Sequence, residues 1–202
     1  MRKILVTLVL AAGSLGAIAA PPVYDINDFS LAGVKLGMTA DEAKAAMASH
    51  YKKSPADIYV KGGAHPTLLS SHPLHSTVEG MYTVVMLSES NPPRVYDVTT
   101  RLPAAMTAAN WVGAINETAK RYGPPTIRRS EPGRRESAIW CDKRTDPATI
   151  KRGFMCDKEG AFALRYSTSK LDTTAITLTS YKMNRQFQAQ SKPVEAGPAF
   201  KY

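Results

Sequence analysis

The sequence predicts an α+β fold, in which two helices are each followed by antiparallel strands. Two stretches, around residues 40–51 and 111–122, carry apolar side chains at helical spacings of three and four. Much of the remaining chain consists of short runs that alternate apolar and polar residues between turn residues, which is typical of hairpin-linked strands. Helices that are interspersed with runs of such strands favour an antiparallel sheet over a parallel, doubly wound one.

The first helix is predicted to begin after Thr39, which is a good N-cap residue. Glu42 stands three residues further on, so the two residues form a capping box, and Asp41 adds negative charge where the helix dipole favours it. Pro55 follows the helix and stops it. The apolar stripe is formed by Ala40, Ala43, Met47 and Tyr51.

The second helix opens in the same way as the first, at Met106-Thr107-Ala108, and ends before Gly123 and two prolines. Its apolar stripe is formed by Trp111, Val112, Ile115, Ala119 and Tyr122. The matching residues of the first helix lie 68 positions earlier. Two interpretations stay open: a degenerate tandem α-β repeat, or two unrelated amphipathic helices with common caps.

Eight stretches are predicted to be strands, and residues 61–76 are predicted to be a loop. Asn91-Pro92-Pro93 cannot continue a ladder, so it is expected to close a hairpin. The predicted strands are Ile58–Val60, Glu79–Ser88, Arg94–Leu102, Thr126–Arg129, Ser137–Asp142, Arg152–Asp157, Ala161–Ser167 and Thr173–Met183.

The N-terminal residues 1–19 read as a secretory signal. Arg2 and Lys3 precede an apolar run, and Ala17-Ile18-Ala19 forms a small-x-small cleavage site. An anchoring helix is the alternative, but a membrane span needs roughly 20 apolar residues, and Gly13, Ser14 and Gly16 interrupt this run. Cleavage would leave 183 residues with a formal net charge of +7 and no transmembrane segment. We expect a periplasmic or secreted protein, and the oligomeric state stays open.

The mature chain is expected to divide into two α+β units and a tail. The first unit covers residues 20–103, and the second, with a disulfide hairpin, covers residues 104–185. The polar, proline-containing residues 186–202 are expected to form a flexible tail.

The two cysteines, Cys141 and Cys156, are expected to form one disulfide. In an oxidising compartment this is the simplest fate of an isolated pair, and here it would join neighbouring predicted strands. A redox pair would normally show a Cys-x-x-Cys spacing, which this chain lacks. Half of a metal site is disfavoured because no histidine is near either cysteine in the sequence.

The stretch Gly37-Met38-Thr39, with the alanine-rich helix after it, resembles the opening of BamE-like small envelope domains. Those domains share a layout of helices on an antiparallel sheet with the β-lactamase inhibitor proteins. Their motif usually closes with Gly-x-Pro, which the second unit keeps as Gly123-Pro124-Pro125, whereas the first unit ends Lys53-Ser54-Pro55. The resemblance implies a non-catalytic periplasmic interaction domain, and it assigns no functional residue.

Four basic pairs within 25 residues form the most distinctive charge feature, and they are expected to surround the disulfide hairpin. They are Arg128-Arg129, Arg134-Arg135, Lys143-Arg144 and Lys151-Arg152. Arginine suits carboxylate and phosphate because its guanidinium donates two parallel hydrogen bonds. The functional interpretation is a surface that faces an acidic protein or an anionic envelope component. The alternative is solvated loop charge that keeps strand edges from aggregating. No motif of a specific nucleic-acid binder is present.

Three histidines, His65, His72 and His75, could hold zinc or copper. Their spacing matches no metal-site signature, so a loop with two His-Pro turns is the preferred interpretation and no metal ligands are predicted. The sequence has no Gly-x-Ser-x-Gly, phosphate loop or dinucleotide fingerprint, so no enzyme activity and no cofactor are predicted. The expected function is that of an exported, non-catalytic binding or scaffold protein of the cell envelope. Inhibition of a secreted enzyme and metal binding are the alternatives.

Overall fold

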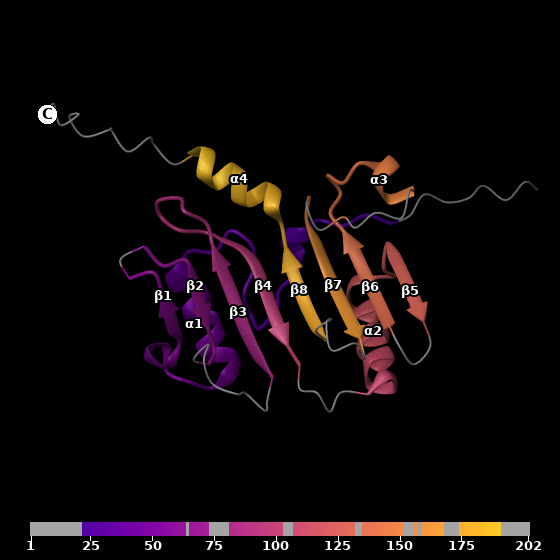
Figure 1. The fold of residues 1–202 in the computed structure, drawn as a ribbon, viewed down its shortest axis with the longest axis horizontal. Coiled ribbons are helices and arrows are strands. Elements are labelled where there is room, and N and C mark those ends of the chain that lie inside the picture. The colour runs from indigo at the N-terminus through magenta and orange to yellow at the C-terminus, as the bar shows by residue number, and fades with distance from the viewer. Residues whose placement is uncertain are drawn as a thin grey trace, which may run out of the picture.

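The computed structural model describes residues 22–63, 65–72, 81–102, 107–131, 135–151, 156, 159–167 and 174–190. The predicted α+β class is confirmed, since within these residues four α-helices accompany a sheet of eight antiparallel strands (Figure 1). The helices are α1 (Ala40–Tyr51), α2 (Ala108–Tyr122), α3 (Pro147–Lys151) and α4 (Tyr181–Gln190). The strands are β1 (Tyr59–Lys61), β2 (Leu68–Ser70), β3 (Tyr82–Leu87), β4 (Val95–Arg101), β5 (Ile127–Glu131), β6 (Arg135–Cys141), β7 (Ala161–Ser167) and β8 (Ala175–Thr179).

The strands form one continuous sheet in the order β1-β2-β3-β4-β8-β7-β6-β5. Each half of the chain supplies a four-stranded meander, and the two meanders join where β4 pairs with β8. The expected hairpin around Asn91-Pro92-Pro93 is present, because β3 and β4 pair antiparallel across it. The sheet is therefore shared by both predicted units instead of being divided into two.

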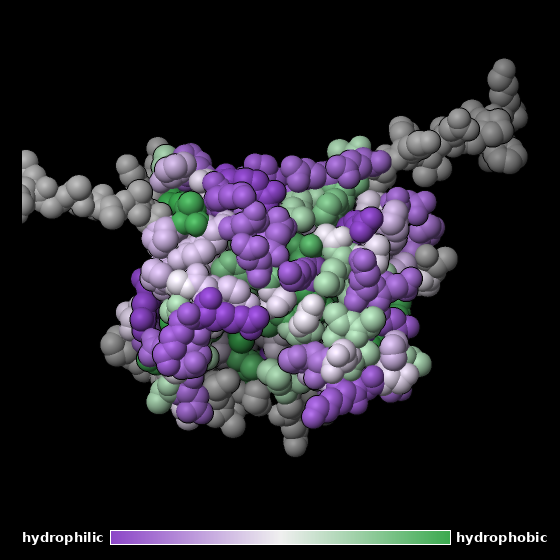
Figure 2. All heavy atoms as spheres, turned by 180° about the vertical axis from the view of Figure 1, so that it is seen from behind, coloured by the Kyte–Doolittle hydropathy of each residue, from purple (hydrophilic) through white to green (hydrophobic). Residues whose placement is uncertain are grey.

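Helices α1 and α2 lie on the same face of the sheet, behind the strands as drawn in Figure 1, with α1 near β3 and α2 near β6 and β7. The main core lies between these helices and the strands, and its largest fully buried side chains include Trp111 and Met47 from the helices and Trp140 and Leu164 from the strands. Figure 2 shows this helix-covered face, where hydrophilic residues gather at both sides and paler or green residues lie between them. The helices thus present an ordinary polar exterior to the surroundings.

The predicted helix caps are confirmed. The backbone N–H of Thr39 donates to Glu42 Oε2 (2.8 Å), and the N–H of Glu42 donates back to Thr39 Oγ1 (3.3 Å). Thr107 caps α2 by accepting from the N–H of Asn110. Gly123 ends α2 with a φ of +89°, a conformation that favours glycine, and any Cβ there would crowd the ring of Tyr24. Both helices are thus specified locally, as their sequences predicted.

Two predictions along the chain are wrong. The predicted loop of residues 61–76 contains β2, which pairs with both β1 and β3. The predicted strand Thr173–Met183 ends early, because β8 stops at Thr179 and α4 begins at Tyr181 and reaches Gln190. Helix α4 therefore also occupies the first part of the predicted flexible tail, and the remainder of that tail is outside the described residues, as is the signal region.

Helix α4 is stabilised by the cap residue Ser180 and by apolar side chains on one of its faces, which pack beside Gly37. Ser180 Oγ accepts from the N–H of Met183 (3.2 Å) and donates to the carbonyl of Glu159 (2.6 Å). Met183 and Phe187, four residues apart, lie beside half-buried Gly37. The helix lies across the strand ends at the top of Figure 1.

Candidate functional site

The face of the sheet opposite α1 and α2 is here called the open face, and it looks toward the viewer in Figure 1. Side chains alternate between the two faces along each strand, so the pairing register assigns every strand residue to one of them. Among the described elements, α3 covers one corner of the open face, where Ile150 packs with Ile139 and the disulfide. Helix α4 borders the open face, because Tyr181 reaches a pocket on it. The described helices leave its centre uncovered.

Three arginines form a row across the open face, on every second strand. In order, the row runs through Arg101 of β4, Ala175 of β8, Arg165 of β7, Ser137 of β6 and Arg129 of β5, and each residue lies directly opposite the next. Neighbouring strands are about 4.8 Å apart, so successive arginines of this row are about 10 Å apart at the backbone. The small side chains between them leave room for the guanidinium groups. We call Arg101, Arg165 and Arg129 the arginine row.

The described strand residues give the open face a net positive charge. Its charged strand residues within the described chain are Lys61, Arg101, Arg129, Arg135 and Arg165 on the basic side, and Asp97 and Glu131 on the acidic side. Arg101, Arg129 and Arg135 are exposed, and Arg165 is half-buried. Five positive against two negative charges on one sheet face favour an anionic partner.

A shallow pocket of about 330 Å³ adjoins the arginine row where β4 meets β8. It is lined by Met86, Tyr96, Asp97, Thr99, Arg165, Thr177, Thr179 and Tyr181. Arg165 donates from Nη1 to Thr177 Oγ1 (3.0 Å), and Thr99 donates from Oγ1 to Asp97 Oδ1 (3.1 Å). The pocket therefore joins a guanidinium to hydroxyl, phenol and carboxylate groups. We call it the β4–β8 pocket.

Two tyrosines form the rim of the β4–β8 pocket nearest α4. The rings of Tyr96 and Tyr181 have centroids 6.1 Å apart. Burial, followed by the nearby negative charge of Asp97, raises the pKa of Tyr96 above its ordinary value. Tyr96 is therefore neutral at physiological pH and able to donate a hydrogen bond. Tyrosine, methionine and arginine are the residue types enriched in protein–protein interfaces, and all three line this pocket.

The structure does not gather the predicted basic pairs into one surface. Arg128 lies opposite Ala138 on the core face of β5, whereas Arg129 and Arg135 lie on the open face. Lys143 and Arg144 follow the other end of β6. Arg134 and Arg152 lie outside the described residues, as does the side chain of Lys151.

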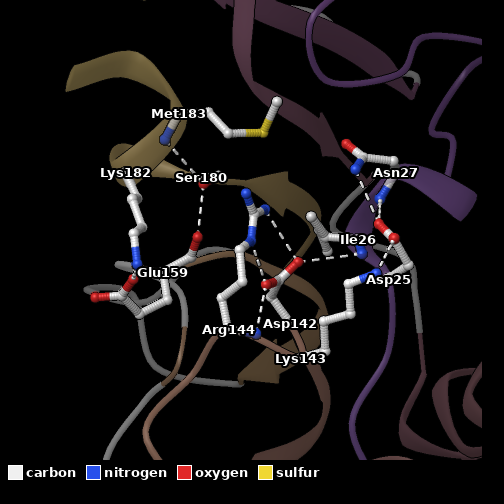
Figure 3. A network of polar contacts seen from close by, with 10 residues as sticks. All are labelled: Asp25, Ile26, Asn27, Asp142, Lys143, Arg144, Glu159, Ser180, Lys182 and Met183. Carbon is white, nitrogen blue, oxygen red and sulfur yellow. Dashed lines mark hydrogen bonds and ion pairs between the residues drawn. The ribbon is translucent and has the colours of Figure 1, made fainter. Parts of the chain in front are cut away.

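Lys143 and Arg144 hold the N-terminal segment of the described chain against the second half (Figure 3). The carboxylate of Asp142 is fully buried and accepts from Arg144 Nε (2.6 Å), Arg144 Nη2 (3.1 Å) and the N–H of Ile26 (3.2 Å). Lys143 Nζ donates to Asp25 (2.5 Å), which lowers the pKa of that carboxyl group below its ordinary value and raises the pKa of Lys143. These two basic residues therefore have an internal, structural role.

The predicted disulfide between Cys141 and Cys156 is present, and most of the strand predicted for Arg152–Asp157 is outside the described residues. Cys141 ends β6, whereas Cys156 lies in a turn, where its carbonyl accepts from the N–H groups of Glu159 and Gly160. Helix α3 lies between the two cysteines in the sequence, and Asp146 and Pro147 begin it, with Asp146 Oδ1 accepting from the N–H of Ala148. The disulfide thus closes a loop that contains a short helix.

The alternative of a metal site at the three histidines receives no support from the described residues. His65 precedes β2 and His72 follows it, so the strand separates them, and His75 is outside the described residues. Across the part of the chain that the structure describes, no group of three or more His, Cys, Asp and Glu side chains could hold a metal ion. Within the same part, none of the helices combines the length and the apolar character that crossing a membrane requires.

Comparison of this chain with protein families, with curated proteins and with solved structures finds no match.

Proposed function

We propose that this protein is an exported, non-catalytic binding protein of the cell envelope, and that its open sheet face docks an acidic protein. The arginine row is the observation that carries this proposal. It places three guanidinium groups at regular intervals on a face whose centre the described helices leave uncovered. Guanidinium groups recognise carboxylates through paired hydrogen bonds, and the Asp and Glu side chains of an acidic protein supply such carboxylates.

The β4–β8 pocket supports a protein partner over a lipid surface. Binding energy at protein interfaces concentrates in a few aromatic and arginine side chains near the centre of the contact. Tyr96, Tyr181 and Arg165 have this composition, and they surround a hollow at the centre of the sheet. A planar array of lipid head groups would not need such a hollow.

The disulfide and the sequence of residues 1–19 support export. A structural disulfide persists in an oxidising compartment such as the periplasm or the extracellular medium. The open face would then meet its partner outside the cytoplasm, in agreement with the predicted location.

We further propose that the two halves of the chain are a degenerate tandem repeat. Three observations support this. The meanders β1–β4 and β5–β8 pair through their last strands, so a two-fold axis would pass between Thr99 and Thr177. The caps of α1 and α2, Thr39 and Thr107, are 68 residues apart. The core residues Ala43 and Met47 of α1 match Trp111 and Ile115 of α2 at the same interval.

An acidic secreted enzyme would be one such partner, so inhibition of a secreted enzyme is the second candidate function. The same uncovered face would serve it, and the layout of helices on one side of an antiparallel sheet is the one that the sequence resemblance implies. Assays of the purified protein against β-lactamases and cell-wall hydrolases would reveal it. Metal binding through the histidine loop has no comparable support.

Charge reversal on the two faces of the sheet tests the proposed function. The variant Arg101→Glu/Arg129→Glu changes exposed positions on the open face, and the matched control Lys44→Glu/Lys120→Glu makes the same change in net charge on α1 and α2. We expect the first variant to lose crosslinked envelope proteins that the wild type and the control both capture, with similar melting temperatures in all three. Equal loss in both variants would indicate a response to net charge alone. Unchanged capture by the first variant would contradict the proposal, as would binding to anionic vesicles in place of protein.

A further inference from the structure

The spacing of the arginine row limits the shape of the acidic partner. Its members occupy every second strand, so they repeat at about 10 Å along a line that crosses the strands. In an α-helix, residues seven apart in sequence lie on nearly the same face and about 10.5 Å apart along the axis. In an extended strand, side chains on one face repeat at about 6.7 Å, which does not match. The row therefore fits a helix better than an extended peptide.

A second row, which carries no charge, lies beside the arginine row. Two residues further along each strand, a line of neutral residues crosses the open face, made of Val84, Thr99, Thr177, Ala163, Ile139 and Ile127. Ile139 and Ala163 are already covered in the second apolar cluster, whereas Val84, Thr99 and Thr177 are half-buried and lie at the centre of the face. A helix lying between the two rows would meet cations on one side and, at the centre of the face, the methyl groups of Val84, Thr99 and Thr177 on the other.

We infer that the open face binds an acidic amphipathic α-helix that lies across the strands, with carboxylates about seven residues apart facing the arginine row. This inference rests on the proposed function, because it specifies the shape of the acidic protein partner. The small residues Ala175 and Ser137 between the arginines let the helix approach the sheet closely. The guanidinium of Arg165, held by Thr177 at the middle of the row, is the specificity-determining group.

Two synthetic peptides test the inference with the full mature chain. Both are alanine-rich, have the same composition and contain about 22 residues, which is long enough to hold a helix. The first places glutamates at intervals of seven with leucines beside them. The second moves the glutamates to intervals of five, which turns successive carboxylates to different sides of the helix and reduces their rise to about 7.5 Å. Circular dichroism checks that both peptides are equally helical, and fluorescence anisotropy at low salt measures binding.

We expect the peptide with glutamates at intervals of seven to bind about tenfold more tightly than the permuted one, since a second and third ion pair form only in the first case. Arg165→Gln is expected to remove most of this difference, whereas the control Lys120→Gln on α2 leaves it unchanged. Equal binding of the two peptides would overturn the inference, and so would binding of neither. Both failures are separable from a failure of the proposed function, because charge reversal of Arg101 and Arg129 tests capture of envelope proteins without reference to the partner's shape.

Discussion

Arg165 and Thr177 are joined on the open face by a 3.0 Å hydrogen bond from Nη1 of the guanidinium to the threonine hydroxyl. Thr177 also lies directly opposite Thr99, where the two meanders meet. The central arginine of the row is therefore oriented by the strand that completes the sheet. A contact of this kind connects the assembly of the fold to the geometry of the proposed binding face.

The first prediction concerns this hydrogen bond. Thr177→Val keeps the shape of the side chain but removes the acceptor, so the guanidinium of Arg165 loses its fixed direction. We expect the acidic peptide with glutamates at intervals of seven to bind about fivefold more weakly, because a hydrogen bond to a charged group at a half-exposed site contributes roughly 1 kcal/mol. Thr177→Ser retains the hydroxyl and should bind like the wild type. Equal affinities of the Val and Ser variants would show that the hydroxyl does not position Arg165.

The second prediction concerns the buried carboxylate of Asp142. In Asp142→Asn, one carboxylate oxygen becomes an amide that donates toward groups that also donate, and Arg144 loses its counter-charge. We expect the free energy of unfolding in urea to fall by about 3 kcal/mol. Asp25→Asn is the matched control, since its ion pair with Lys143 is exposed and should matter little. Similar losses in both variants would contradict the structural role of the buried group.

The third prediction concerns the disulfide. Cys141→Ala/Cys156→Ala removes a bridge that closes a loop with a sequence separation of 15 residues. By the chain-entropy argument this costs about 3 kcal/mol of unfolding free energy. Reducing agent should lower the stability of the wild type toward that of the variant and leave the variant unchanged. A variant as stable as the oxidised wild type would show that the surrounding apolar cluster holds the loop without the bridge.

The fourth prediction concerns the capping box of α1. In the folded protein, hydrogen bonds from the N–H of Thr39 and, to a smaller extent, from its hydroxyl lower the pKa of Glu42 below its ordinary value of 4.5. Ionised Glu42 therefore stabilises the folded state above the unfolded pKa, and this contribution disappears as the pH falls through the folded pKa. The melting temperature of Glu42→Gln should lie below that of the wild type at neutral pH, and the gap should close as the pH falls through the lowered pKa of Glu42 in the folded protein. A gap that is constant with pH would be inconsistent with the capping role.

The helices could be predicted from the sequence because their signals are local. Thr39 and Glu42 are three residues apart, and both act on backbone groups of the same turn. Helix α4 also has such signals, in Ser180 as cap and in Met183 with Phe187 as an apolar pair. The strand pattern that precedes these signals outweighs them, and the helix also depends on packing beside Gly37, which is distant in the sequence.

The arginine row could not be predicted, because it depends on pairing register. The alternation of Phe162, Leu164 and Tyr166 does place Arg165 on the opposite face of its strand. Nothing in the sequence, however, aligns Arg165 with Arg101, because their strands, β7 and β4, do not pair with each other. Both pair with β8, and their alignment depends on the register of those two pairings. The basic pairs were conspicuous in the sequence for their spacing, yet alternation along β5 sends Arg128 and Arg129 to opposite faces.

Site-specific photocrosslinking in the native envelope tests most directly whether the open face is the docking face. A photoreactive residue would replace Tyr82 or Thr99 on the open face, and Ser49 on α1 or Glu117 on α2 as matched positions on the other side. We predict that the first two positions capture the same protein and that the two helix positions do not. Capture of that protein from Ser49 or Glu117, with none from Tyr82 and Thr99, would contradict the account.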